Sequence, residues 1–422
     1  MSEETLSAVV VGLGYVGLPL AREMTAAGVR CAGVDSNPAV VAALNHGQSH
    51  VDDVSDDDVL AMLGAGFRAT TDPATFQRAD AIVICVPTPL RDDHAPDLEY
   101  VFQAARAIAP HLSAGTLVVL ESTTYPGTTD GPVRAILEES GLVAGVDFHL
   151  AFSPERIDPG NPTYGVRNTP KVVGGLTAAC TARAVEFYGT FIDTVVPTAG
   201  PREAELAKLL ENTYRHVNIA LVNEMAVFCH ELGVDIWAAI EAASTKPFGF
   251  HAFYPGPGVG GHCIPIDPNY LSYRVRSLGY PFRFVELAQE VRNRMPAYVV
   301  TRIQLVLNEL GLPVKGSKIL LLGLTYKPDV SDARETPAIP IIRRLREQGA
   351  AIVGHDPHLA QFAVDGSPID MADDLVLATK SADLVVLLQA HTAYDSAMIV
   401  SHAAHVFDTR GVVTPGPTVS RL

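Results

Sequence analysis

Cysteine, tryptophan and clustered basic residues are all scarce in this chain of 422 residues. Its five cysteines are widely spread without a CxxC pair, which favours reduced thiols over a disulfide framework or a structural zinc site. A formal net charge of −16 argues against surfaces for nucleic acid or anionic membranes, because both need clustered Lys and Arg. Neither a run of roughly 18 apolar residues nor a secretory signal pattern is present. We therefore expect a cytoplasmic globular protein of two or three domains, with no nucleic-acid or membrane partner.

Residues 8–35 follow the pattern of a dinucleotide-binding βαβ unit. An apolar strand over 8–11 leads into GLGYVG, then come a helical segment, a second strand over 29–34 and an acidic residue. The first glycine permits a tight turn, the second lets the backbone approach a pyrophosphate, and the third packs helix on strand. The acidic residue accepts hydrogen bonds from a ribose and repels a 2′-phosphate, so the pattern predicts NAD. The predicted cofactor contacts are Gly12, Gly14, Tyr15, Val16, Gly17 and Asp35.

Three further apolar strands end in short polar loops. ADAIVICVPTPL leads to Pro87 and Thr88, GTLVVLESTTYPGTT to Thr123, and HLAFSPERIDPGN to Glu155 and Arg156. Because the carboxyl ends of strands in open α/β sheets border the ligand, these residues are candidates to contact cofactor or substrate. For the two threonines, a role in capping is the alternative.

Residues 201–232 show helical periodicity without a breaker, between Pro201, which suits a first turn, and Gly233, which suits a helix end. A helix of about 32 residues is roughly 48 Å long and usually joins domains or lies in a dimer interface. Lys208, Asn212 and Arg215 fall on one stripe of it, either facing a ligand or forming a solvated polar face. A second helical stretch over 281–311 completes an all-α middle region.

The stretch YPGPGVGGHCIPIDP, residues 254–268, places Cys263 among glycines and prolines. Cysteine is usually an inert buried hydrophobe. A thiol in such a loop suggests a reaction, with the glycines letting backbone and substrate meet without a Cβ between them. A metal site built from His262, Cys263 and Asp267, with His251 as a further candidate, is the alternative, but the spacing gives no four clear ligands.

After residue 312 the βαβ pattern restarts, with GLTYK in place of GLGYVG. An apolar strand ends at Gly323, a helix is closed by Gly349, and a second strand ends at Asp356. This predicts a second Rossmann-like domain that has lost the dinucleotide fingerprint and binds a different nucleotide. A purely structural domain is the alternative.

The chain resembles the UDP-glucose/GDP-mannose dehydrogenase family in VGLGYVGLPLA, ESTTYPGTT, AELAKLLENTYRHVNIALVNE, GPGVGGHCIPIDPNY and GLTYKPDVSDARETPA. The resemblance implies an α/β fold of two Rossmann-like doubly wound domains joined by a long helix within an all-α middle domain. The implied domains are 1–200, binding NAD; 201–312, with the long helix, the Cys loop and a homodimer contact; and 313–422, binding the UDP-sugar. GGHC and SPERIDPGN resemble the branch that oxidises UDP-N-acetylhexosamines and favour UDP-N-acetylglucosamine, with UDP-glucose and UDP-N-acetylmannosamine as alternatives.

The resemblance also implies a four-electron oxidation of a sugar C6 alcohol to a carboxylate, with two NADH formed. Cys263 is then the nucleophile, Lys208 and Asn212 stabilise the oxyanion, and Asp267 supports the Cys loop. Thr123 and Glu155 position a water and assist proton transfer. The implied cofactor contacts include Pro87, Thr88, Thr123 and Arg334, and the substrate contacts are Glu155, Arg156, Lys208, Asn212, Tyr254, Gly258, Gly260 and Lys327; no metal is implied. A two-electron β-hydroxyacid dehydrogenase and an NAD sensor without turnover are the rival interpretations.

Overall fold

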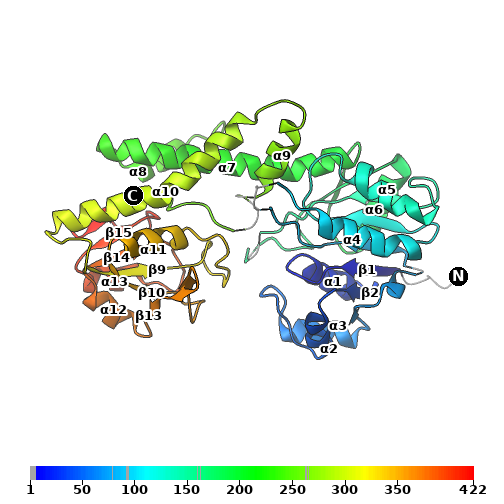
Figure 1. The fold of residues 1–422 in the computed structure, drawn as a ribbon, viewed down its shortest axis with the longest axis horizontal. Coiled ribbons are helices and arrows are strands. Elements are labelled where there is room, and N and C mark those ends of the chain that lie inside the picture. The colour runs from blue at the N-terminus through cyan, green and yellow to red at the C-terminus, as the bar shows by residue number, and fades with distance from the viewer. Residues whose placement is uncertain are drawn as a thin grey trace. The chain divides into compact units, whose positions relative to one another are not determined.

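The computed structural model describes residues 6–77, 79–91, 95–158, 160–161, 163–261, 264 and 266–422 (Figure 1). The chain divides into two compact units. The first contains the residues up to Glu211 and Asn269–Gly279, and the second contains Asn212–Pro268 and Tyr280–Leu422. The long helix α7 contributes residues to both.

The first unit is built on an eight-stranded sheet with the order β3-β2-β1-β4-β5-β6-β7-β8. All pairs are parallel except β6 with β7. The strand order reverses between β1 and β4, which is the switch point where doubly wound sheets bind ligands. The elements are β1 Ser7–Val11, α1 Gly17–Ala26, β2 Arg30–Val34, α2 Pro38–Asn45, α3 Asp56–Gly64, β3 Arg68–Thr70, β4 Ala81–Ile84, α4 Glu99–Ile108, β5 Leu117–Leu120, α5 Arg134–Leu137, β6 His149–Phe152, β7 Lys171–Gly175, α6 Ala178–Tyr188, β8 Val195–Pro197, α7 Pro201–Glu231 and α9 Asp267–Arg276.

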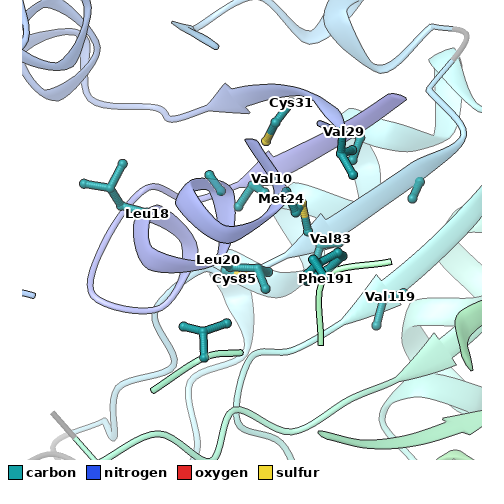
Figure 2. Packing of buried hydrophobic residues seen from close by; sticks show 14 of the residues in the cluster. Val10, Leu18, Leu20, Met24, Val29, Cys31, Val83, Cys85, Val119 and Phe191 are labelled. Atoms are coloured by element: carbon teal, nitrogen blue, oxygen red, sulfur yellow. The ribbon is translucent and has the colours of Figure 1, made fainter. Parts of the chain in front are cut away.

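Helices cover both faces of this sheet because successive strand side chains point to opposite sides. Val10, Val83 and Val119 pack in one cluster with Leu20 and Met24 of α1 (Figure 2). The residues next to them in the strands pack on the other face, against α4. Both faces are therefore apolar, which explains why the strands read as continuous hydrophobic runs.

The second unit contains a six-stranded sheet, β13-β10-β9-β14-β15-β16, in which every pair is parallel. Relative to β9, this is the order of the first six strands of the other sheet around β1, so the predicted second Rossmann-like domain is confirmed. Helices α10 and α11 share a core with one face, and α12 and α13 with the other. The elements are α8 Ile236–Ser244, α10 Arg283–Glu309, β9 Lys318–Leu322, α11 Ala338–Glu347, β10 Ala351–His355, β11 Ala363–Val364, β12 Ser367–Pro368, β13 Asp370–Met371, α12 Leu375–Ser381, β14 Leu384–Leu387, α13 Ser396–His402, β15 Val406–Asp408 and β16 Val419–Arg421.

The two predicted long helices are present as α7 and α10. Helix α7 begins at Pro201, and Gly233 follows its end with a φ of 67°, a left-handed conformation that closes a helix. Among the residues described, none of the helices combines enough length and apolar character to traverse a bilayer.

Candidate active site

The glycine turn after β1 has two glycines that packing requires and one that it does not. A Cβ on Gly12, whose φ is 90°, would lie 2.7 Å from the carbonyl oxygen of Cys85, and one on Gly17 would lie 1.9 Å from that of Gly12. A Cβ on Gly14 would have no neighbour within 4 Å. The open space therefore lies at Gly14, before the first turn of α1, which no side chain caps. Such a helix N-terminus offers backbone N–H groups to an anion.

Asp35, at the carboxyl end of β2, is fixed against this turn. Its carboxylate accepts hydrogen bonds from the backbone N–H of Leu13 (2.9 Å) and of Asn37 (2.8 Å), and the side chain is only half-buried. A partly exposed carboxylate here can receive a ribose diol and disfavours a 2′-phosphate. Tyr15 is exposed and Val16 precedes the first residue of α1. These residues fit NAD.

The loops after β4 and β5 border the same edge of the sheet. Pro87 is exposed and Thr88 is buried, and the Thr88 carbonyl accepts a hydrogen bond from the Tyr270 hydroxyl of α9 (2.6 Å). Thr123 is half-buried, between Ser122 and Thr124, which are both buried. The structure thus places these predicted residues at the carboxyl edge without showing what they bind.

Glu205 of α7 braces the loop that carries Thr123, a role that the sequence patterns missed. Its carboxylate accepts hydrogen bonds from the backbone N–H (2.9 Å) and hydroxyl (2.7 Å) of Thr129 and from the N–H of Gly127 (2.7 Å). Burial raises the pKa of Glu205 to about 7, although these hydrogen bonds lower it. Lys208 lies three residues further along the helix and is buried.

Glu155 and Arg156, after β6, lie in a network of charges. The Arg156 guanidinium forms an ion pair with Glu211 of α7 (2.6 Å). The Glu155 carboxylate lies 3.5 Å from the ammonium of Lys171, which also contacts Glu121 at 2.8 Å. Neither Lys171 nor Glu121 was predicted to be functional. Lys171 only adjoins an apolar strand, and Glu121 opens the ESTTYPGTT motif without a role having been assigned to it.

In the second unit, Asn212 and Asp267 are brought together. The Asn212 side-chain amide donates a 2.7 Å hydrogen bond to the Asp267 carboxylate, and both residues are buried. Lys208 lies one helical turn before Asn212 on α7. Cys263, the predicted nucleophile, and His262 lie outside the residues that the structure describes.

The glycines before Cys263 pack against the loop that follows β9. A Cβ on Gly260 would lie 2.6 Å from the Cβ of Tyr326 and 2.7 Å from the carbonyl oxygen of Glu335. A Cβ on Gly261 would lie 2.6 Å from the Tyr326 ring. The backbone N–H of Gly261 donates a hydrogen bond to the carbonyl of Arg334 (3.1 Å). The sequence suggested that these glycines make room for a substrate; close packing of two loops is a sufficient reason for them.

Two side chains hold the start of the same loop. Asn223 of α7 accepts a hydrogen bond from the N–H of Gly256 (2.9 Å), and the Arg292 guanidinium of α10 donates to the carbonyl of Val259 (2.9 Å). Gly258, with a φ of 146°, lies between these two anchors. The loop is therefore fixed to both long helices.

Three further predicted residues lie at the start of this loop or in the loop after β9: Tyr254, Lys327 and Arg334. The Tyr254 ring stacks on Trp237 with centroids 6.1 Å apart and 11° between the planes. The Arg334 guanidinium pairs with Asp332 of its own loop (2.6 Å). The Lys327 carbonyl accepts a hydrogen bond from the Thr325 hydroxyl (2.9 Å).

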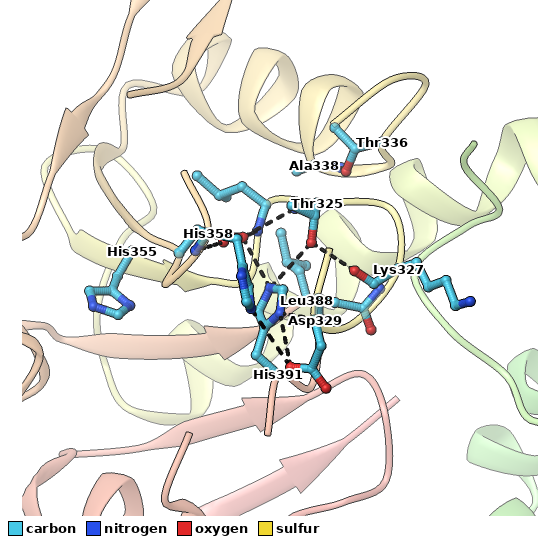
Figure 3. A network of polar contacts seen from close by, with 12 residues as sticks. Thr325, Lys327, Asp329, Thr336, Ala338, His355, His358, Leu388 and His391 are labelled. Atoms are coloured by element: carbon cyan, nitrogen blue, oxygen red, sulfur yellow. Dashed lines mark hydrogen bonds and ion pairs between the residues drawn. The ribbon is translucent and has the colours of Figure 1, made fainter. Parts of the chain in front are cut away.

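Thr325, His358 and His391 lie close together in the second unit (Figure 3). Beside them, Asp356 occupies the place in the second sheet that Asp35 occupies in the first, but its side chain is fully covered. Its carboxylate accepts hydrogen bonds from the backbone N–H of Leu324 (2.6 Å) and His358 (2.8 Å) and contacts the His391 ring nitrogen at 3.1 Å. Although burial alone would raise it, these hydrogen bonds lower the pKa of Asp356. A carboxylate whose side chain is fully covered does not receive a ribose, which explains the loss of dinucleotide binding here.

Asp329, His358 and His391 lie close enough to suggest a metal site. However, His391 accepts the backbone N–H of Asp329 at one ring nitrogen (2.9 Å), and its other nitrogen faces Asp356 (3.1 Å). Neither nitrogen of His391 is available as a ligand. His391 therefore anchors the loop after β9 by accepting the Asp329 N–H, and the His358 ring lies 3.7 Å from the Asp329 carboxylate.

Two Rossmann-type sheets, one with an intact glycine turn and an accessible carboxylate at the end of its second strand, are typical of nucleotide-dependent oxidoreductases. Comparison with known sequences makes this specific. Residues 7–192, 202–294 and 320–415 match the NAD-binding, central and UDP-binding domains of the UDP-glucose/GDP-mannose dehydrogenase family. The chain belongs to this family, and it is an NAD-dependent dehydrogenase.

Three relatives are similar over nearly their full length. The chain is 36% identical over 411 residues to a UDP-N-acetyl-D-mannosamine dehydrogenase of Yersinia pestis, covering 93% of this chain and 95% of that one. It is 36% identical over 420 residues to an NDP-N-acetyl-D-galactosaminuronic acid dehydrogenase of Ralstonia nicotianae, covering 96% and 95%. A solved UDP-D-ManNAc dehydrogenase from Pyrococcus horikoshii has a TM-score of 0.88 at 31% identity, covering 99% of both chains.

Proposed function

We propose that this protein oxidises the C6 alcohol of a UDP-N-acetylhexosamine to the carboxylate. One alcohol, one water and two NAD⁺ give one carboxylate, two NADH and three protons. The observation that carries this proposal is the buried hydrogen bond between Asn212 and Asp267, which ties the long helix to a residue four positions after Cys263. NAD supplies a hydride acceptor for each of the two oxidations.

Cys263 makes the second oxidation possible. An aldehyde has no alkoxide from which a hydride can leave, but addition of the thiolate to its carbonyl carbon gives a thiohemiacetal that has one. Loss of a hydride then leaves a thioester. The thiolate is the reactive form, and a neighbouring ammonium favours it, a role that we assign to Lys208.

The oxyanion formed at C6 requires hydrogen-bond donors. The Asn212 amide nitrogen carries two N–H groups, of which one donates to Asp267. We assign the other to the oxyanion, together with the Lys208 ammonium. Thr123 and Glu155 are the proposed partners of the water that hydrolyses the thioester.

We propose a UDP-N-acetylhexosamine as substrate because one relative is named for UDP-N-acetyl-D-mannosamine and another for an NDP-linked N-acetyl-D-galactosaminuronic acid, so both names contain an N-acetylated nucleotide sugar. The motifs GGHC and SPERIDPGN favour UDP-N-acetylglucosamine, whereas the names of the relatives support the alternative UDP-N-acetylmannosamine. An NADH assay with UDP-N-acetylmannosamine, UDP-N-acetylglucosamine, UDP-N-acetylgalactosamine and UDP-glucose separates these options by kcat/KM.

The same assay tests the reaction type. Two NADH per sugar support the covalent route, and one NADH would leave only a two-electron dehydrogenase. Cys263→Ser should abolish carboxylate formation, whereas Cys229→Ser, at a buried cysteine of α7, is the matched control and should retain it. Normal two-NADH turnover by Cys263→Ser would refute the thioester.

We also propose a homodimer formed through α7. Leu210, Tyr214, Leu221 and Phe228 are between 45% and 62% exposed, and their spacing of four and seven residues places them on one stripe of the helix. A second copy of the same stripe is a complementary partner. Leu210→Glu with Leu221→Glu should halve the molar mass measured by light scattering, while Leu305→Glu, equally exposed on α10, should not.

A further inference from the structure

Lys171 reaches the ligand edge of the first sheet because of a strand reversal. Strand β7 runs antiparallel to β6, with Ala151 opposite Gly175 and Phe152 opposite Gly174. Continuing that register places Glu155 opposite Lys171. The first residue of β7 therefore lies at the edge where the parallel strands end.

The Lys171 ammonium is buried between two carboxylates. Its nitrogen lies 2.8 Å from Glu121 and 3.5 Å from Glu155, and only 6% of its side chain is exposed. Tyr188 of α6 donates its hydroxyl to the other oxygen of Glu121, and its ring centroid is 5.4 Å from the ammonium. Burial would lower the pKa of Lys171, but the two carboxylates outweigh it and raise that pKa, so the side chain stays charged.

The contact with the Lys171 ammonium completes the set of interactions that hold the Glu155 carboxylate in place. One carboxylate oxygen accepts hydrogen bonds from the backbone N–H of Arg156 (2.7 Å) and Ile157 (2.6 Å), and the other faces Lys171. The carboxylate is thus held at both oxygens, by its own turn and by the neighbouring strand. Its side chain remains 11% exposed, so it keeps access to solvent.

Stability alone is a poor reason for this arrangement. Desolvating a buried ion pair offsets most of its Coulombic gain, and apolar residues of similar size serve folding equally well. The Lys171–Glu121 pair would also be satisfied without a second carboxylate at 3.5 Å. The contact with Lys171 therefore matters chiefly for the orientation of the Glu155 carboxylate.

We propose that Lys171 is a positioning residue that holds the Glu155 carboxylate for thioester hydrolysis, with Glu121 and Tyr188 as its anchor. This rests on the proposed function. In that step, a water oxygen bonds to the carbonyl carbon of the Cys263 thioester and the carbon–sulfur bond breaks. The products are the sugar carboxylic acid and the thiol, and Glu155 takes a proton from the water and returns it to the departing sulfur.

The test separates this step from the hydride transfers. Lys171→Met should lower kcat by roughly 10²-fold, the scale of a general-base contribution, with little change in KM. Rapid mixing should show a burst of two NADH per active site before the slow phase. Mass spectrometry of the quenched protein should find the uronyl thioester on Cys263, and Lys171→Arg should restore part of kcat.

Two further variants keep the result interpretable. Lys171→Met with Glu121→Gln removes the anchor without leaving an unpaired buried carboxylate, and should show the same burst if the single variant does not fold. Lys318→Met, at the exposed first residue of β9, should behave as the wild type.

Wild-type steady-state turnover by the Lys171 variants, or equal loss of the burst and the slow phase, would overturn the positioning role. Absence of NADH formation by the wild-type protein with every UDP-sugar would instead refute the proposed function.

Discussion

The glycine turn after β1 allows packing and cofactor binding to be separated by two single substitutions. Gly17→Ala places a Cβ 1.9 Å from the Gly12 carbonyl oxygen, more than 1 Å inside a normal contact, and that neighbour is backbone. Overpacking of this kind costs about 1–3 kcal/mol. For a domain of this size, that corresponds to a fall in Tm of roughly 2–12 °C.

Gly14→Ala should preserve the stability of the fold and weaken cofactor binding. The new Cβ has no protein neighbour within 4 Å, and Gly14 is not among the glycines with positive φ. Alanine at a compatible position changes the free energy of unfolding by about +0.4 to +1 kcal/mol. The methyl group instead occupies the space through which a pyrophosphate approaches the backbone. Losing one charge-assisted hydrogen bond costs about 1.5–3 kcal/mol, so the Kd for NAD should rise at least tenfold.

Thermal unfolding without cofactor and calorimetric titration with NAD measure the two effects on the same preparations. The expected result is a stable Gly14→Ala variant with weak NAD binding and a Gly17→Ala variant with reduced Tm. If Gly14→Ala binds NAD as tightly as the wild type, or loses as much stability as Gly17→Ala, the assignment of the open space to the pyrophosphate is refuted.

Three other predictions concern the second unit. Asn212→Ala removes a hydrogen-bond donor to the buried Asp267 carboxylate and should lower both the Tm and kcat, since a hydrogen bond to a charged group contributes about 1.5–3 kcal/mol; an unchanged kcat would exclude Asn212 from the site. Gly261→Ala should lower the Tm through its clash with the Tyr326 ring, and combination with Tyr326→Ala, which removes that ring, should recover part of the loss in a double-mutant cycle. Burial and the Arg292 charge lower the pKa of His216 from 6.5 to about 4, so the unfolded chain binds the proton more tightly and stability falls as the pH drops from about 6.5 to 4. This loss, about 3 kcal/mol in full, should disappear in chemical denaturation of His216→Phe.

Much of the architecture could be predicted because it depends on local patterns. The two βαβ units are marked by apolar strands, closing glycines and terminal acids, and the structure has a doubly wound sheet in each unit, as expected. Helix α7 begins and ends where its proline and glycine indicate. The reversal of β7 is different: nothing in a continuous apolar strand tells which direction it takes, because that depends on its neighbours.

The site was predictable only where a motif carried it. Asp35 follows from its distance to the glycine turn, and its two backbone hydrogen bonds agree with that role. Lys171 could not be found, because its proposed role depends on a register between strands that no local spacing encodes, and Glu121 lies in a motif that does not itself indicate which residue it pairs with. The glycines before Cys263 were assigned to substrate approach, since the sequence did not show that the loop after β9 packs against them.

The two sheets show how one local geometry supports two uses. In both, the strand after the first helix ends in an aspartate that accepts a backbone N–H from the turn after the first strand. Asp35 keeps one side toward solvent, whereas Asp356 is covered by His391 and its side chain is inaccessible. The difference in exposure between the two aspartates therefore lies in the loops around them, because the strand, turn and helix before each aspartate are arranged alike. A carboxylate at this position serves the structure when a neighbouring ring covers it, and it can receive a ligand hydroxyl when that ring is absent.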